Sequence, residues 1–281
     1  MKKESFGIVQ IVLAEFFIAV VYIMARVGRD FGNYNLAFFR IFLAAFFVGL
    51  LFFVSRKYHL APLRYQIGKL IFFGAIHGFI IIAAFISLNT ISIASSVLLQ
   101  STIALFTAIF SIFLLKERLT IRVLIAIVIS FVGMFFLFTP QTFFLRENMI
   151  GGATGLFVGV FGGLVYAMSK TFKKYDKISL TFWQNLIALP FILPLLFLEP
   201  IVFSLNNSVL VVFMGVFAAL SFIFLYKGLG KVKGTKASVL TLLYAVFSIL
   251  IAAVLFKELP MLKEVIGGVL ILFAAYLSTS Q

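Results

Sequence analysis

Three polar side chains lie deep inside long apolar segments of this sequence. Glu15 and His77 each fall in the middle of an apolar run, and Gln100 lies about a turn and a half into another, at a similar expected depth. An ionisable group at the centre of a bilayer costs about 2.5–3.5 kcal/mol on insertion scales, so such a residue marks a candidate functional site. A carboxylate there needs a partner or a proton, and a nearby histidine can share that proton. The three residues predict solute binding, with proton coupling through Glu15 as one interpretation.

Each of these residues also has a purely structural interpretation. Glu15 can hydrogen-bond to a neighbouring helix and only fix packing, and His77 can be an interior histidine with satisfied nitrogens. Arg40 comes early in the second apolar run, near the outer surface. It can therefore extend towards the lipid headgroups, or bind a carboxylate or phosphate group.

Three tyrosines, at positions 22, 166 and 244, place hydroxyl groups at depth. A hydroxyl in the bilayer core needs a hydrogen-bond partner, which favours the wall of a polar cavity. Together with the residues above and one threonine, they form the set of candidate substrate-binding residues. That set is Glu15, Tyr22, Arg40, His77, Gln100, Tyr166, Thr241 and Tyr244.

A face of small, partly polar residues in the run 93–115 recurs in the run 237–256. The first face is Ser96, Gln100, Ala104, Thr107 and Ser111, and 141 positions later stand Ala237, Thr241, Ala245, Ser248 and Ala252. In lipid no water drives helices together, so small side chains that permit close approach mark packing seams. The two faces either form such a seam between the halves of the chain or line a solute cavity.

The composition is that of a membrane protein. Of the 281 residues 63% are hydrophobic, 38 are phenylalanine and only 11% are charged, with a mean hydropathy of +1.20. The 23 Lys and Arg residues outnumber the 9 Asp and Glu residues. They lie in short clusters between apolar runs, which is typical of a topology signal and not of nucleic-acid binding. We expect the lipid bilayer, and no nucleic acid, as a partner.

Ten apolar runs of about 20 residues, the length of a helix that crosses the hydrocarbon core, are joined by short polar segments. They cover residues 6–25, 36–54, 67–88, 93–115, 121–138, 150–169, 178–198, 208–226, 237–256 and 261–278. The sequence therefore predicts an all-α membrane protein with ten transmembrane helices.

The second half of the chain weakly repeats the first. Tyr22-Ile23-Met24-Ala25-Arg26 is echoed 144 positions later by Tyr166-Ala167-Met168-Ser169-Lys170, and Leu115-Lys116-Glu117-Arg118-Leu119 is echoed 141 positions later by Phe256-Lys257-Glu258-Leu259-Pro260. We predict two five-helix repeats, residues 1–144 and 145–281. An odd number of spans inverts the second repeat, and inverted repeats place a binding site near the bilayer midplane. The Lys-Glu pair should form a helix boundary and not a substrate contact.

The basic residues predict the orientation of the chain in the membrane. With the N-terminus inside, 17 Lys and Arg residues fall on the inner side, and only Arg26, Arg29, Arg146, Lys257 and Lys263 fall on the outer side. Because cytoplasmic loops collect Lys and Arg, we predict a multi-pass protein of the cytoplasmic membrane with both termini in the cytoplasm.

A glycine ladder stands in the sixth run. Gly151, Gly155, Gly159 and Gly163 follow one another at four-residue spacing, a small-xxx-small pattern that favours close packing against another helix.

The sequence offers little for an enzyme. It contains no H-E-x-x-H or G-x-S-x-G motif and no cysteine, and its two aspartates, Asp30 and Asp176, fall in loops. We predict no catalytic residue, metal or cofactor. A channel or scaffold is the alternative from another class, although no pore loop or ring of charged residues is recognisable.

Arg40 in the second run, Ala94-Ser95-Ser96 opening the fourth and Leu115-Lys116-Glu117-Arg118-Leu119-Thr120 closing it give the chain a family resemblance. With its ten short helices it resembles EamA-type permeases of the drug/metabolite transporter superfamily over essentially its whole length. The resemblance implies a secondary transporter that moves a small metabolite, amino acid or drug-like solute by alternating access, with proton coupling and exchange as open alternatives. Uptake of a nucleotide-like metabolite is also known within the superfamily.

Overall fold

A computed structural model of the protein describes residues 2–54, 60, 66–91, 93–118, 120–137, 149–201, 204–256 and 262–279. All regular structure in these ranges is helical, as predicted. In chain order the helices are α1 (Lys2–Val27), η1 (Arg29–Phe31), α2 (Asn33–Val54), α3 (Ile67–Thr90), α4 (Ile93–Ser101), α5 (Ile103–Leu115), α6 (Ile121–Leu137), α7 (Met149–Ser169), α8 (Lys177–Ile192), η4 (Leu193–Leu198), α9 (Leu205–Leu229), α10 (Gly234–Leu240), α11 (Leu243–Phe256) and α12 (Leu262–Thr279).

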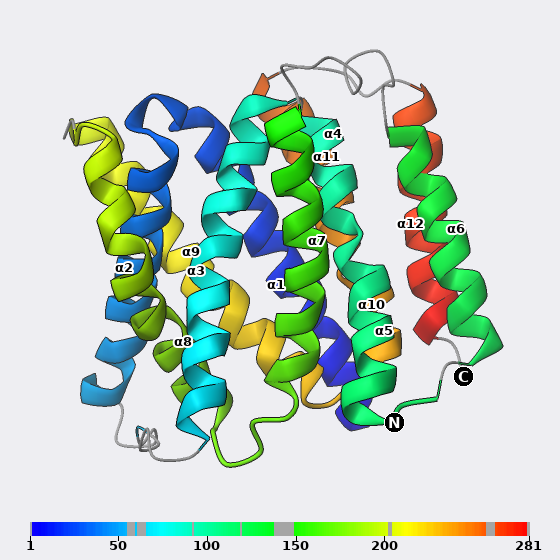
Figure 1. Ribbon diagram of the computed structural model, residues 1–281. Helices are drawn as coiled ribbons and strands as arrows, with labels where there is room; N and C mark the ends of the chain where they lie inside the picture. Colours follow the sequence, from blue (N-terminus) through cyan, green and yellow to red (C-terminus); the bar gives the residue numbers. More distant parts are fainter. Residues whose placement is uncertain are drawn as a thin grey trace.

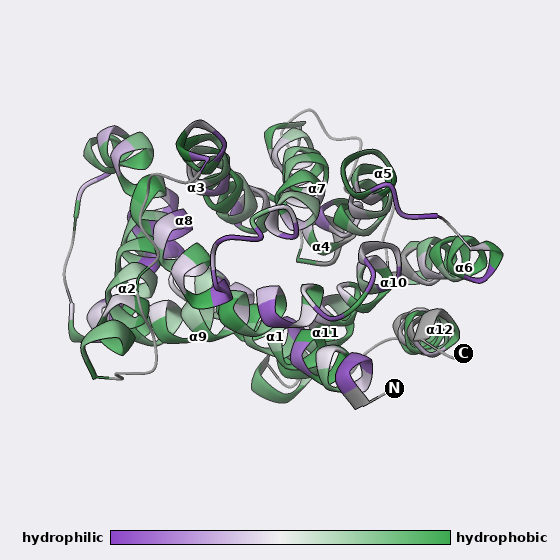
Figure 2. Ribbon diagram, turned by 90° about the horizontal axis from the view of Figure 1, so that it is seen from below, coloured by the Kyte–Doolittle hydropathy of each residue, from purple (hydrophilic) through white to green (hydrophobic). Residues whose placement is uncertain are grey.

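These helices form a bundle suited to a lipid bilayer (Figure 1). Seven described stretches are long and apolar enough to cross a membrane, and shorter apolar helices at 99–115, 121–133 and 265–274 accompany them. Each of the ten predicted runs is helical where the structure describes it, apart from turns at residue 102 and at residues 241–242. Seen from the end that carries both termini, the helices are mainly hydrophobic and the hydrophilic residues gather in the connecting segments (Figure 2). The chain is therefore a multi-pass membrane protein.

The fourth and ninth predicted runs are each divided into two helices. Between α4 and α5 the amide of Thr102 donates to the carbonyl of Leu99, and between α10 and α11 the amide of Leu242 donates to that of Val239. Both are tight three-residue steps that interrupt the α-helical ladder. Interrupted backbone at membrane depth is tolerated only inside the protein or beside a cavity, so the paired breaks indicate where an interior site lies.

The helix contacts are preserved when the two halves are exchanged. Helix α1 packs against α9 and α11, and its counterpart α7 packs against α3 and α5. Likewise α2 contacts α9, and its counterpart α8 contacts α3. Two further contacts join corresponding helices of the two halves: α2 packs against α8, and α6 packs against α12. Helix α1 rises from the lower end of the bundle in Figure 1, whereas α7 descends from the upper end. The predicted boundary at 144/145 lies outside the described residues.

One pair of polar contacts follows the sequence repeat closely. The guanidinium of Arg26 donates to the carbonyl of Leu88 at 2.7 Å. The Nζ of Lys170 donates to the carbonyl of Val232 at 3.1 Å, and both partners stand 144 positions after their counterparts. In each half, the end of the first helix is thus fastened to the end of the third.

The glycine ladder of α7 is a packing surface, as predicted. A Cβ atom added to Gly155 would lie 2.9 Å from the Cβ of Leu99, and one added to Gly163 would lie 2.6 Å from the Cβ of Phe106. Such distances leave no room for a side chain, so α7 lies directly against α4 and α5. This close approach brings the second half onto the broken helix of the first.

Candidate functional site

A small polar cavity lies between helices of both halves, next to the two helix breaks. It is lined by Glu15, Ile18 and Tyr22 of α1, Gln100 and Ile103 of α4 and α5, Val158 and Tyr166 of α7, and Thr241 and Tyr244 at the break between α10 and α11. Its volume is about 20 Å³, enough for roughly one water molecule. The cavity is therefore too small for a solute in this conformation.

Hydrogen bonds connect polar side chains in the wall of the cavity. The hydroxyl of Tyr22 donates to Oε1 of Gln100 at 2.8 Å, and Nε2 of Gln100 donates to Oγ of Ser96 at 2.7 Å. Ser96 in turn shares a hydrogen bond of 2.8 Å with Ser87. A chain of polar groups thus runs from α1 through α4 to α3, and it fixes the amide of Gln100 with its oxygen towards Tyr22.

The carboxylate of Glu15 is the charged group of this cavity. The residue is only 2% exposed, and in the part of the chain that the structure describes its oxygens receive no hydrogen bond. Tyr22, Tyr166 and Tyr244 surround it closely enough to interact electrostatically. A buried carboxylate without a protein donor must carry a proton or meet a cationic group of a ligand. Glu15 can therefore bind either a proton or a cationic group of a ligand.

The structure brings six of the eight predicted site residues into this one cavity: Glu15, Tyr22, Gln100, Tyr166, Thr241 and Tyr244. Arg40 and His77 do not line it. The structure does not group His77 with Glu15, because His77 packs edge-on against Phe222 at 4.8 Å and is not among the residues that line the cavity. The sequence predicted that His77 and Glu15 lie at a similar depth, but it did not predict which neighbouring helices their side chains face.

Arg40 does not extend to the headgroups, which was one of its two predicted roles. It is 1% exposed, and its guanidinium lies 5.7 Å from the ring centre of Phe85 and 5.8 Å from that of Phe222. The helices α3 and α9 therefore enclose it within the bundle.

Three apolar residues of the cavity were not predicted: Ile18, Ile103 and Val158. Two of them carried a signal in the sequence. Ile18 follows Glu15 by three positions and precedes Tyr22 by four, and Ile103 follows Gln100 by three, so each shares a helix face with a predicted residue. Val158 has no such neighbour, and only the packing of α7 identifies it.

The two small-residue faces combine both predicted interpretations. Gln100 and Thr241 line the cavity, whereas Ser96, Ala104, Ala237 and Ala245 are at most 1% exposed and do not reach it. Each face is therefore a packing seam with one cavity-lining residue beside the helix break.

The repeat architecture corresponds to a known family. A sequence model of the EamA-like transporter family matches residues 5–139 and again residues 149–280. The chain belongs to the EamA-like transporter family. Membership indicates a membrane transporter of small solutes, in agreement with the prediction that the chain is not an enzyme.

A solved structure supports the same fold for this EamA-like chain. It is described only as "Crystal structure of protein" and has a TM-score of 0.81. The similarity covers 99% of this chain and 96% of that one, at 18% sequence identity. No curated protein matches the sequence.

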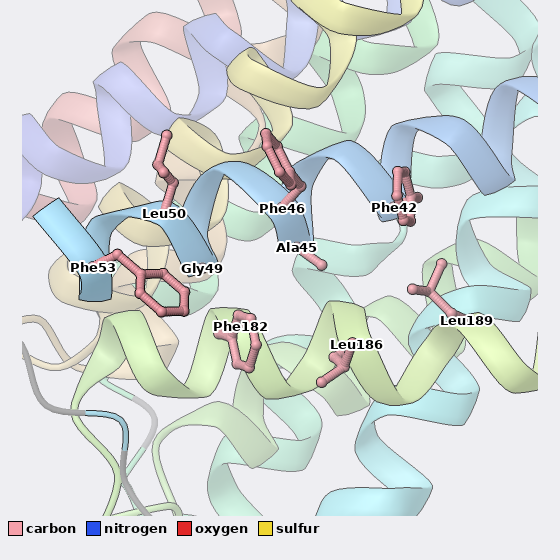
Figure 3. A pocket seen from close by; sticks show the side chains of 9 residues that line it. All are labelled: Phe42, Ala45, Phe46, Gly49, Leu50, Phe53, Phe182, Leu186 and Leu189. Atoms are coloured by element: carbon pink, nitrogen blue, oxygen red, sulfur yellow. The ribbon is translucent and has the colours of Figure 1, made fainter.

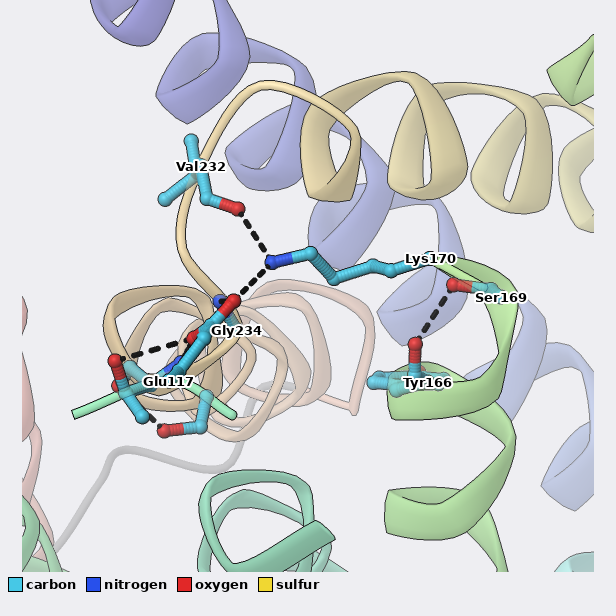
Figure 4. A network of polar contacts seen from close by, with 8 residues as sticks. Glu117, Tyr166, Ser169, Lys170, Val232 and Gly234 are labelled. Carbon is cyan, nitrogen blue, oxygen red and sulfur yellow. Dashed lines mark hydrogen bonds and ion pairs between the residues drawn. The ribbon is translucent and has the colours of Figure 1, made fainter. Parts of the chain in front are cut away.

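An ion pair joins the two halves of the EamA-like chain at the end that carries the termini (Figure 4). Nζ of Lys170, after α7, lies 2.6 Å from a carboxylate oxygen of Glu117, after α5. The same carboxylate accepts the backbone amides of Gly234 and Thr235 at 3.1 Å each. Glu117 thus forms a helix boundary, as predicted, but it caps α10 of the other half. The second copy of the motif, Lys257-Glu258, lies outside the described residues.

A larger hollow between α2 and α8 has a different character (Figure 3). It measures about 340 Å³ and is lined only by apolar residues: Phe42, Ala45, Phe46, Gly49, Leu50, Phe53, Phe182, Leu186 and Leu189. Phe53 is 89% exposed and Phe46 is 55% exposed. In an EamA-like bundle embedded in lipid, this surface faces acyl chains, and it offers no polar group to orient a solute. The small polar cavity is therefore the candidate functional site.

Tyr244→Phe is expected to lower the free energy of unfolding by about 1 kcal/mol, within the range for hydrogen bonds between membrane helices. The hydroxyl of Tyr244 donates to the carbonyl of Val97 at 2.8 Å and lies 2.9 Å from Oγ of Ser101. It thus links the ninth run to the end of α4. A double-mutant cycle with Ser101→Ala, measured by chemical unfolding in micelles, isolates this link. If the effects of the two substitutions on the unfolding free energy are strictly additive, the side chains of Tyr244 and Ser101 are not energetically coupled, and the prediction is contradicted.

Proposed function

We propose that the protein is a secondary transporter that moves a small solute across the cytoplasmic membrane by alternating access. In this proposal ten transmembrane helices form two inverted five-helix repeats, residues 1–144 and 145–281, and the solute binds at the polar cavity between them. The carrying observation is the convergence of Glu15, Gln100 and three tyrosines from both halves on one enclosed space. A site built equally by two related halves can open to either side of the membrane.

The small size of the cavity supports a closed conformation as the starting point. A solute of even a few heavy atoms needs several times its volume of about 20 Å³, so helices must separate for binding. Glu117 and Lys170 hold the two halves together at the end with the termini. We infer that this end is cytoplasmic, from the distribution of basic residues, and that breaking the ion pair opens the cytoplasmic entrance.

The free carboxylate of Glu15 supports proton coupling as part of the proposal. A proton on Glu15 and a cationic group of the solute would compete for the same two oxygens, so that binding one displaces the other. Such competition couples the movement of the solute to that of protons. Exchange of one solute for another, without protons, is the alternative mechanism.

A thermal-shift screen identifies the solute class. Purified protein in micelles is heated with amino acids, nucleotides or drug-like cations, and a compound that binds the native state raises the unfolding midpoint. We expect compounds with a cationic group to do so, and the shift to be absent in Glu15→Gln. If no compound of any class shifts the midpoint in a Glu15-dependent manner, the proposed binding site is wrong.

Glu15→Gln is expected to reduce transport of the identified solute by about tenfold or more, which corresponds to about 1.4 kcal/mol, and to remove its dependence on pH. The amide keeps the shape of the side chain but cannot release a proton. The measurement is uptake of labelled solute into proteoliposomes between pH 5.5 and 8.5. Asp30→Asn is the matched control, since the Asp30 carboxylate is 94% exposed and lies outside the cavity. Uptake by Glu15→Gln with the wild-type pH profile would rule out the coupling role.

A further inference from the structure

Arg40 is a buried cation whose charge the described structure leaves uncompensated. Its residue exposure is 1%. Each of its three guanidinium nitrogens is inaccessible and, among the described residues, has no hydrogen-bond partner. By contrast, the guanidinium of Arg26 donates to the carbonyl of Leu88 at 2.7 Å. Two arginines on successive long helices of the chain, α1 and α2, are thus in opposite situations.

The neighbours of Arg40 are aromatic or polar, and none that the structure describes is an anionic partner. The guanidinium faces the rings of Phe85 and Phe222 at 5.7 and 5.8 Å. The side chains of Tyr22 and Tyr166 lie within electrostatic range of it, without a hydrogen bond to it. The ring of His77 also packs on Phe222, at 4.8 Å. No carboxylate bonds to Arg40 in the described ranges.

Aromatic faces alone do not compensate such a charge. A guanidinium carries five N–H donors, and removing it from water costs more than two ring faces return, unless its donors are also satisfied. Arginine retains its proton under these conditions, so it cannot escape the cost by neutralisation. Planar bidentate binding of an anionic group is the arrangement that its geometry favours. The missing component at this position is therefore an anion.

We propose that Arg40 binds a compact monovalent anionic group, a halide ion or a carboxylate. Tyr166 supplies a second donor, because its hydroxyl borders the central cavity and has no hydrogen-bond partner in the described part of the chain. In the present conformation the guanidinium nitrogens are sealed, so the anion enters when the wall formed by Tyr22 and Tyr166 moves.

The proposal does not rest on transport, because binding can be read from stability. Purified wild-type protein in micelles is kept at constant ionic strength while sodium gluconate, whose carboxylate carries a five-carbon polyol chain too bulky for a compact site, is replaced stepwise by sodium chloride or sodium acetate. We expect the unfolding midpoint to rise by several degrees and to saturate. A rise with both salts identifies a free-anion site, and a rise with acetate alone identifies recognition of a solute carboxylate. A midpoint that is independent of the anion in both titrations would overturn the proposal.

Arg40→Met, which keeps the length and apolar stem of the side chain, locates the effect. We expect this variant to lose the anion response and to be at least as stable as wild type in gluconate, because it lacks the uncompensated charge. Arg26→Met is the matched control and should keep the response. If Arg40→Met keeps the response, or if Arg26→Met loses it in the same way, Arg40 is not the binding residue.

A direct binding measurement covers the case in which Arg40→Met does not fold. Equilibrium dialysis of wild-type protein against radiolabelled chloride and radiolabelled acetate should reveal one saturable site per chain. Arg40→Lys, which retains the charge but not the bidentate geometry, should bind the same ion at least tenfold more weakly. Absence of saturable binding of either ion to the wild type would refute the site.

Discussion

Gly163→Val is expected to destabilise the protein by about 3 kcal/mol or more, at the upper end of the cost of overpacking. The ladder of α7 lies directly on α5, and a Cβ at Gly163 would stand 2.6 Å from the Cβ of Phe106 and 2.7 Å from the backbone nitrogen of Thr107. A backbone atom cannot move aside as the end of a side chain can. The two helices would have to separate, and with them the wall of the cavity. Chemical unfolding and the yield of monodisperse protein measure the effect.

Gly268→Val is the matched control for this prediction. Gly268 also lies inside an apolar helix, α12, but a Cβ added there meets no atom within 4 Å. We expect a change in unfolding free energy within about 0.5 kcal/mol, as for surface substitutions in general. Equal effects of the two valines would show that helix propensity, and not the contact between α7 and α5, sets the cost at Gly163.

Glu117→Gln is expected to lower the free energy of unfolding by about 2 kcal/mol, somewhat below the cost of breaking a fully buried ion pair. The side chains of Lys170 and Glu117 are 15% and 13% exposed, and they approach to 2.6 Å. The amide retains the shape of the carboxylate but loses the charge that holds Lys170 and two backbone amides. Glu4→Gln is the control, because Glu4 pairs with Lys236 at 3.2 Å with side-chain exposures of 31% and 21%. We expect it to cost at most about 0.5–1 kcal/mol.

The contribution of Glu117 should also depend on pH. Burial raises the pKa of Glu117, but hydrogen bonds from Lys170 and from the amides of Gly234 and Thr235 outweigh it, so the pKa lies below its usual value. The stabilisation is therefore complete above the unfolded-state pKa, about 4.3, and is lost as the pH falls through the lower folded-state pKa. The difference in stability between wild type and Glu117→Gln should be constant from pH 7 to about pH 5 and shrink below that. A difference that stays constant down to pH 3 would contradict this assignment.

The position of this ion pair gives it a role in the proposed transport cycle. At one end of the bundle Lys170 binds both Glu117 and the carbonyl of Val232. At the other end its repeat counterpart Arg26 binds the carbonyl of Leu88. The halves are thus fastened by charge at the end with the termini. If this end is the closed cytoplasmic entrance, Glu117→Gln should favour its opening as well as lower stability.

Much of the architecture could be predicted from the chain because lipid restricts the choices. Backbone groups in a bilayer must be bonded within their own segment, so each apolar run of sufficient length had to be helical. A polar side chain inside such a run is costly unless it faces the interior. For this reason Glu15, Gln100 and the three tyrosines could be assigned to a common cavity before any contact was known, and they line it together.

What the sequence did not predict depends on how helices distant in the chain turn towards one another. Arg40 and His77 have the same sequence signature as Glu15, yet they pack around Phe222 of α9. Glu117 was expected at a boundary between successive helices, but its carboxylate caps α10 of the other half. The breaks after α4 and α10 carry no proline or glycine at the step itself. Local composition fixed which residues are helical and which side chains must avoid lipid. Which interior partner each side chain meets depends on packing between segments more than a hundred residues apart, because helix rotation and close approach are set jointly by all the surfaces in contact.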